Sequence, residues 1–297
     1  MIGILSKSNN FLGIGSKHSS YPHSQIVIVS APLEKTVSYG KGTAAAPKAI
    51  LKASHYVEFY DEETKRELCF EKGICTLASL NFNKIRVDES LNKTYKLVKE
   101  ILEDNKFVVT LGGEHTVSYA PVKVHLEKYP RLSVLQIDAH SDLRDTYEGT
   151  KYSHACVMAR VAEHTKNIVQ VGIRAQAAEE AEFIKKNKIN TFYARDIRQN
   201  KLGRDWKKKV LSKLNKNVYI TFDVDGLDPS VIPATGTPEP GGLMWDETMD
   251  LLKLVGKERN IVGFDVVELA PNKHHTASDF ITAKLVYKIL NYAFIKK

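Results

Sequence analysis

The chain is poor in cysteine and has no long apolar run. Its three cysteines, Cys69, Cys75 and Cys156, are odd in number and form no Cys-X-X-Cys pair. Such a set argues against a disulfide framework and favours free thiols in a reducing compartment. No apolar stretch approaches the roughly 20 residues that a helix needs to span a bilayer, and the apolar patch near the N-terminus is too brief for a secretory signal. We therefore expect a cytoplasmic protein without a membrane partner.

The sequence also lacks internal repeats, low-complexity tracts and a long Pro/Gly/Ser linker. We expect a single catalytic domain over residues 21–297, preceded by an extension, residues 1–20, whose structure the sequence leaves open. The net charge of +8 raises the question of nucleic acid binding, but the 43 Lys and Arg residues are spread along the chain. The longest basic run, residues 207–209, is typical of a solvated helix face. We therefore expect no nucleic acid partner.

Short apolar, β-branched runs alternate with longer segments of helical periodicity. The runs begin at positions 26, 74, 107, 133, 168, 190, 218 and 261. Residues 89–103 place Leu91, Tyr95, Val98 and Leu102 on one helical face, and residues 277–294 have the same character. This alternation predicts an α/β fold in which helices cover both faces of a mostly parallel, roughly eight-stranded sheet. The runs at 74–80 and 190–194 are the weakest and are expected at an edge or as irregular segments.

Chemically reactive residues collect directly after these runs. Gly112-Gly113-Glu114-His115 follows one run, Asp138, His140 and Asp142 follow the next, Asp223 and Asp225 follow a third, and Glu268 follows the last. Ligands of open α/β sheets bind beyond the carboxyl ends of the strands. In extended backbone, residues two apart project to one side, so the acids and His140 are expected to face one crevice.

Such a cluster of acids and imidazoles predicts metal ions. Buried together, these groups would repel one another unless cations lay among them. Four carboxylates balance two divalent ions, and an oxygen-rich donor set without thiolates suits Mn²⁺ or Mg²⁺. Two adjacent ions lower the pKa of a shared water, which predicts hydrolysis. Singly, each motif has an ordinary explanation: a surface-loop Asp-X-Asp, a tight turn with a capping acid at Glu114, or a structural His140.

Together, the motifs resemble the ureohydrolase family of arginase and agmatinase. The matching stretches are GGEH (112–115), DAHSD (138–142), SHA (153–155), FDVDGLDPS (222–230), PATGTPEPGGL (233–243) and VELAP (267–271), and SYGKGTAAAPKAIL (38–51) resembles the family's substrate loop. The resemblance implies a three-layer α/β/α fold, two Mn²⁺ per subunit, release of urea from a guanidino group, and a trimer or hexamer. One ion would take His115, Asp138, Asp142 and Asp223, and the other Asp138, His140, Asp223 and Asp225.

The resemblance also implies roles for three further residues. His154 corresponds to the family's active-site histidine, which moves protons or orients the substrate, and its ordinary alternative is a packing histidine. Glu268 corresponds to the carboxylate that holds the guanidinium through a forked pair, although an acid before Pro271 would otherwise be unremarkable. Thr237 is expected at the wall of the site. Asp228, which precedes a proline, is expected to form a turn.

One position departs from arginases and bears on the substrate. Arg144 stands where arginases carry an asparagine that helps to hold the α-amino-acid end, and the segments around it resemble agmatinase more closely. We therefore expect a small cationic substrate, agmatine, and putrescine and urea as products in polyamine biosynthesis. The alternatives are arginase, guanidinobutyrase or aminopropylagmatine ureohydrolase activity, a single-metal deacetylase-like hydrolase, and a metal-stabilised binding protein without activity.

Overall fold

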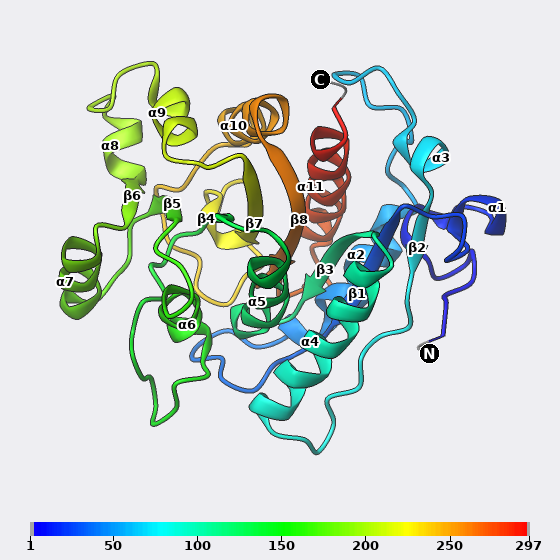
Figure 1. The fold of residues 1–297 in the computed structure, drawn as a ribbon, viewed down its shortest axis with the longest axis horizontal. Helices are drawn as coiled ribbons and strands as arrows, with labels where there is room; N and C mark the ends of the chain where they lie inside the picture. Colours follow the sequence, from blue (N-terminus) through cyan, green and yellow to red (C-terminus); the bar gives the residue numbers. More distant parts are fainter. Residues whose placement is uncertain (1–2, 296–297) are drawn as a thin grey trace.

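The computed structural model describes residues 3–295, and within them eight parallel strands form one sheet (Figure 1). The strands are β1 (Ile26–Ala31), β2 (Ile74–Thr76), β3 (Phe107–Gly112), β4 (Ser133–Ile137), β5 (Ile168–Ile173), β6 (Asn190–Tyr193), β7 (Asn217–Asp223) and β8 (Asn260–Val267). Their order across the sheet is β2-β1-β3-β8-β7-β4-β5-β6. The predicted fold is confirmed, and the two weakest runs form the two edge strands, β2 and β6.

Helices cover the sheet on both faces, as the apolar strands require. The helices are α1 (Ser16–Ser19), α2 (Ala46–Ser54), α3 (Leu68–Lys72), α4 (Val87–Glu103), α5 (Tyr119–Lys128), α6 (Val157–Ala162), α7 (Ala178–Asn187), α8 (Ala194–Arg198), α9 (Trp206–Ser212), α10 (Trp245–Glu258) and α11 (Ala277–Ala293). In Figure 1, α4, α5 and α6 gather on one side of the strands and α10 and α11 on the other. Strands such as β1 and β4 are therefore buried along their whole length.

The two predicted helices form within two residues of the expected bounds, and on the predicted face of the first only Tyr95 is partly exposed. The segment predicted at 89–103 forms α4, whose buried face includes Leu91, Val98 and Leu102. The segment predicted at 277–294 forms α11, which packs against α2 and α10. Removing such faces from water is the main favourable contribution to folding, roughly 25 cal/mol for each Å² of apolar surface.

The N-terminal extension packs against the domain within the described residues. Phe11 and Leu12 are buried. The Phe11 backbone N–H donates to Thr76 Oγ1 at 3.0 Å, and that of Leu12 donates to Ser54 Oγ at 2.8 Å. These bonds join the segment to β2 and α2. Met1 and Ile2, also part of the predicted extension, lie outside the described residues.

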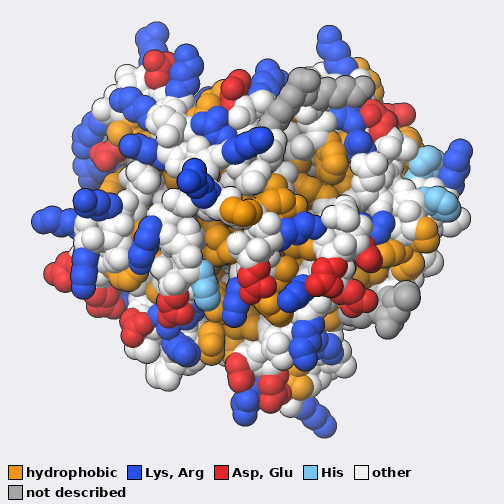
Figure 2. All heavy atoms as spheres, in the orientation of Figure 1, with side chains coloured by type: hydrophobic (Ala, Val, Ile, Leu, Met, Phe, Trp, Pro, Cys, Tyr) orange, Lys and Arg blue, Asp and Glu red, His pale blue; other side chains and the backbone are white. Residues whose placement is uncertain are grey.

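The helices relate to the expectation about membranes, and the surface charges relate to the expectation about nucleic acid. Over residues 3–295, no helix combines the length and the apolar character needed to cross a membrane. On the face drawn in Figure 2, Lys and Arg side chains are distributed over the surface with Asp and Glu side chains among them. The three cysteines are free and buried.

Candidate metal centre

The six predicted ligands converge at the carboxyl ends of three central strands. His115 follows β3, Asp138 follows β4, and Asp223 ends β7. In chain order β4 would follow β3, but β8 and β7 lie between them in the sheet. Reactive residues from distant parts of the sequence are therefore brought to one crevice, as expected where the strand order switches. The cluster comprises His115, Asp138, His140, Asp142, Asp223 and Asp225.

One half of the cluster surrounds the Nδ1 atom of His115. This nitrogen lies 3.1 Å from Asp138 Oδ2, 3.0 Å from Asp142 Oδ2 and 3.4 Å from Asp223 Oδ2. The His115 side chain is buried, and within residues 3–295 its Nδ1 has no hydrogen-bond partner. A buried nitrogen without a partner, surrounded by three carboxylate oxygens, is the donor set that a divalent cation would complete.

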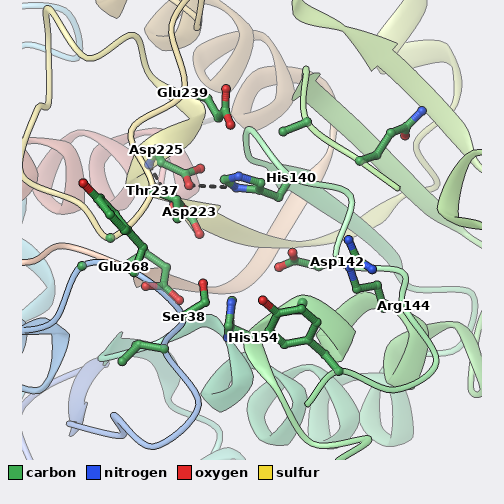
Figure 3. Close-up of a pocket in the computed structure, with 18 of the residues that line it drawn as sticks. Ser38, His140, Asp142, Arg144, His154, Asp223, Asp225, Thr237, Glu239 and Glu268 are labelled. Atoms are coloured by element: carbon green, nitrogen blue, oxygen red, sulfur yellow. Dashed lines mark hydrogen bonds and ion pairs between the residues drawn. The ribbon is translucent and has the colours of Figure 1, made fainter. Parts of the chain in front are cut away.

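The other half is built on His140 and shares Asp138. His140 Nδ1 lies 3.0 Å from Asp225 Oδ2 and 3.7 Å from Asp138 Oδ1, and Figure 3 shows the ring facing the Asp225 carboxylate. The candidate ligand atoms of His115, Asp138 and Asp142 lie within 4.8 Å of one another, as do those of Asp138, His140 and Asp225. Because Asp138 belongs to both groups, the arrangement fits two adjacent ions better than one.

The tautomer of His115 also fits metal binding. Its other ring nitrogen, Nε2, lies 2.9 Å from Thr221 Oγ1, and the Thr221 hydroxyl donates to Asp265 Oδ1 at 2.7 Å. With its hydrogen committed to this carboxylate, Thr221 Oγ1 accepts from Nε2–H. The Nδ1 lone pair then faces the carboxylates, which is the arrangement of a metal-ligating histidine.

The backbone that carries the candidate ligands is turned and not extended. Extended backbone was expected through 138–142 and 223–225, and this expectation is wrong. Residues Val224–Gly226 form a 3₁₀ turn, and Asp142 has a left-handed φ of 54°. The first acid of each motif fixes the turn itself, because Asp138 Oδ1 accepts the His140 N–H at 2.6 Å and Asp223 Oδ1 accepts the Asp225 N–H at 2.8 Å.

Burial and crowding change the acidity of these ligands in opposite directions. Burial and the nearby Asp138 raise the pKa of Asp142 to about 7, and burial with two neighbouring aspartates raises the pKa of Asp223 well above its usual range. Burial opposes ionisation of His140, but Asp225 raises the pKa of this imidazole to about 10. The same ion pair with His140 stabilises the charged form of the Asp225 carboxyl, so its pKa is lowered to about 2 despite burial.

His154 and Glu268 line the cavity that opens over this cluster. The cavity has a volume of about 270 Å³ and is lined by ligands of both halves together with His154, Thr237 and Glu268. Burial and the charges of His115 and His140 lower the pKa of His154 to about 4, so its imidazole is neutral at physiological pH. Figure 3 shows His154 and Glu268 on the same side of the cavity. The structure thus brings together all the predicted site residues, and their individual roles remain predictions.

Glu268 is held rigidly beside the first ligand. Its Oε1 accepts the backbone N–H of His115 at 2.6 Å, and its own N–H donates to Gly113 O at 2.8 Å. Its φ of 64° lies in the left-handed region, which non-glycine residues occupy mainly where the surrounding structure enforces it. These contacts leave one carboxylate oxygen available to the cavity.

The outer wall of the cavity includes residues that the sequence did not single out. Ser38, Tyr39, Tyr147, Gln176 and Glu239 all line it. Glu239 lies within the quoted PATGTPEPGGL stretch, so the motif marked the segment but not the side chain. Ser38 and Tyr39 likewise lie within the quoted SYGKGTAAAPKAIL stretch. Tyr147 and Gln176 come from loops, where no strand pattern indicates that a side chain faces a cavity. Asp228, by contrast, forms the expected turn and accepts the Ser230 N–H at 3.0 Å.

The match of this chain to known families agrees with this fold and site. The family model described as "Arginase family" matches residues 24–293, and the chain belongs to that family. It is therefore a hydrolase of the ureohydrolase type, acting on guanidino or amidino groups, and its family has a binuclear metal centre.

Two relatives and one solved structure are similar to this chain over most of its length. The chain is 38% identical to an N(1)-aminopropylagmatine ureohydrolase of Synechocystis sp., over 92% of this chain and 90% of that protein. It is 34% identical to an agmatinase of Bacillus cereus, over 94% and 95% of the two chains. The solved structure of agmatine ureohydrolase of Thermoplasma volcanium superposes with a TM-score of 0.84 at 28% identity, covering 99% of this chain and 94% of that one.

Proposed function

We propose that this protein hydrolyses the guanidino group of agmatine to putrescine and urea, with two Mn²⁺ ions at the centre described above. The metal identity is supported by a donor set of four carboxylates and two imidazoles without thiolate, which suits Mn²⁺ better than a structural zinc ion. When bound, two such ions lower the pKa of a shared water and stabilise negative charge on the reacting group.

The side chains around the centre supply binding and proton transfer. Glu268 presents its free carboxylate oxygen to the cavity and would hold the guanidinium by a charge-assisted hydrogen bond. His154 is neutral near pH 7 and lines the same cavity, so it would accept a proton there and deliver it to the leaving amine. Thr237 completes the wall on the side of Asp223 and Asp225 (Figure 3).

The charges farther along the cavity support an amine tail, and this observation carries the choice of agmatine. The Glu239 carboxylate lines the cavity and, within residues 3–295, has no hydrogen bond or ion pair. The cationic Arg144 is already paired, because its Nη1 lies 3.1 Å from Glu179 Oε1. A nearby second cation, Arg174, donates to the backbone carbonyls of Asp225 and Glu239, and its charge reaches the Glu239 carboxylate without forming a close ion pair. The charged side chain of the cavity wall that lacks a close partner in the described part of the chain is thus the Glu239 carboxylate. It would attract the ammonium group of a substrate tail and repel a carboxylate.

N(1)-aminopropylagmatine is the second candidate, favoured by the relatives. Three similar proteins, at 35 to 38% identity, carry the name N(1)-aminopropylagmatine ureohydrolase. This substrate has the same guanidino end as agmatine and a longer tail with two amines. Glu239 supports either compound, because both place an ammonium beyond the guanidino group.

A urea-release assay on the Mn²⁺-loaded protein tests the proposal. Agmatine, N(1)-aminopropylagmatine, arginine and 4-guanidinobutyrate would be compared by kcat/KM. We expect agmatine or its aminopropyl derivative to exceed both carboxylate-bearing compounds by at least about 100-fold, roughly 3 kcal/mol of selectivity. Preference for arginine or guanidinobutyrate would overturn the assignment of the tail. Two bound ions without urea from any compound would favour the binding-protein alternative.

A further inference from the structure

A buried acid, a threonine and the candidate proton-transfer histidine are connected by hydrogen bonds outside the metal cluster. Glu114 is fully buried. Its Oε2 accepts the backbone N–H groups of Lys35 and Thr36 at 2.9 and 2.7 Å, and its Oε1 accepts the Thr36 hydroxyl at 3.0 Å. One carboxylate therefore fixes both the backbone and the side chain of Thr36.

The Thr36 hydroxyl meets His154 at two points. Its Oγ1 accepts the His154 backbone N–H at 3.2 Å and lies 3.4 Å from the ring atom Nδ1. A hydroxyl has one hydrogen to donate and two lone pairs to accept with. Because the hydrogen points to the Glu114 carboxylate, the strongest acceptor nearby, Thr36 acts towards His154 as an acceptor.

This polarity sets the tautomer of His154. An acceptor next to Nδ1 favours the form in which Nδ1 carries the hydrogen, and the lone pair is then on Nε2. Ser153 Oγ, 3.3 Å from Nδ1, is a second hydroxyl on the same side. Tyr147 packs its ring edge-to-face against the imidazole, with centroids 5.6 Å apart and an interplanar angle of 80°. The ring is therefore held on both sides in the cavity wall.

We propose that Thr36 and Glu114 are positioning residues that hold His154 in the Nδ1–H tautomer, with Nε2 available to exchange a proton with the substrate. The same contacts attach the loop that follows Thr36 to His154, and residues 37–40 of this loop line the cavity. The backbone makes the contact possible at Gly113, since a Cβ there would lie 2.1 Å from Leu33 O. The inference rests on the proposed role of His154 in proton transfer.

The variants Thr36→Val and Thr36→Ser separate the hydroxyl from the shape of the side chain. Valine keeps the volume and loses the hydroxyl, and serine keeps the hydroxyl. General acid–base groups contribute about 10²- to 10⁴-fold to rates, so we expect Thr36→Val to lower kcat for agmatine by at least about tenfold with KM within about threefold. Thr36→Ser should recover most of this loss. Thr248→Val is the matched control, since its hydroxyl donates to Met244 O on α10, outside the cavity lining.

A change of leaving group tests whether proton delivery is the lost step. Fluorine atoms near the leaving nitrogen of agmatine make the departing amine less basic, so its protonation matters less. The defect of Thr36→Val should shrink with this analogue, whereas a purely structural defect should not. Equal kcat for Thr36→Val and the wild type, equal loss in the serine variant, or loss of bound metal would overturn the proposal.

Histidine-selective ¹⁵N NMR of the metal-free protein gives a readout that does not depend on turnover. The His154 signals, identified by their absence in His154→Gln, should show the Nδ1–H tautomer in the wild type and a shift towards Nε2–H in Thr36→Val. An Nε2–H tautomer in the wild type would overturn the positioning role. If the tautomer is as expected but no guanidino compound is hydrolysed, the proposed function fails while the positioning geometry stands.

Discussion

Loading the metal-free protein with Mn²⁺ at pH 7 should release more than one proton per chain. The imidazole of His140 is protonated without metal, because Asp225 raises its pKa to about 10 against the effect of burial. The pKa of His115 is raised by the surrounding carboxylates despite burial, and that of Asp223 by burial and its neighbours, so both bind a proton more strongly than usual. Each must lose its proton to become a ligand. Asp142, with a pKa of about 7, adds about half a proton.

The direction of the pH dependence follows from these shifts. Raised pKa values mean that protons compete with the metal more strongly as the pH falls. The logarithm of the overall loading constant should therefore increase by more than one for each pH unit between pH 6 and 7. A site of ordinary exposed aspartates, already ionised at pH 6, would show almost no slope.

Calorimetric titration of Mn²⁺ into the chelator-treated protein measures the release directly. The apparent binding heat in phosphate and in Tris differs by the number of protons released multiplied by the difference in buffer ionisation enthalpy. His164→Gln is the control, because His164 contacts the Tyr119 hydroxyl at 3.0 Å, away from the cluster, and it should release as many protons as the wild type. Release of fewer than one proton per chain would refute the six-ligand site.

Three further predictions concern single side chains. Glu268→Gln should lower kcat by at least about 100-fold while two metal ions per chain remain by elemental analysis; loss of metal would make Glu268 a ligand. Glu239→Gln should lower kcat/KM for agmatine about tenfold, or 1.4 kcal/mol, and an unchanged value would remove it from the tail site. Lys288→Met leaves the buried Asp61 without its ion-pair partner, 2.8 Å away, and should cost about 3 kcal/mol in urea unfolding. In the wild type, Lys253 and Lys288 lower the pKa of Glu63 to about 2 despite burial. The ionised Glu63 therefore stabilises the fold above pH 4.5, and this contribution is lost as the pH falls towards 2. The pH-dependent part of the unfolding free energy should be smaller in Lys288→Met.

The fold and the convergence of the candidate metal ligands could be predicted because both depend on local patterns. Buried parallel strands require continuous apolar runs, and the runs at positions 107, 133, 218 and 261 are the four central strands. Their polar ends then had to meet at one edge of the sheet. The weak run at 190 forms the edge strand β6, which is only partly buried, whereas the other edge strand, β2, is short but buried.

Contacts between loops could not be predicted in this way. Thr36 and Glu114 are 78 positions apart, and nothing in either segment shows that the carboxylate accepts the threonine hydroxyl. Glu114 was expected at most to cap a turn, and the structure shows that it fixes a second loop. The turns at Asp138 and Asp223 were also missed, because an aspartate that accepts the N–H two residues on has the same spacing as an extended segment.

The division between strand ends and loops also explains why the reaction is easier to infer than the substrate. The candidate metal ligands and Glu268 lie at the ends of strands, which cannot shift without disrupting the core. Residues 37–40, Arg144, Tyr147 and Glu239, which line the cavity, belong to loops, and loops tolerate substitution. Relatives can therefore keep the centre and differ in the compound that they accept. For this chain, we expect the Glu239 carboxylate to decide the choice of substrate tail, because a change of its charge would alter the tail that the cavity favours without moving any candidate metal ligand.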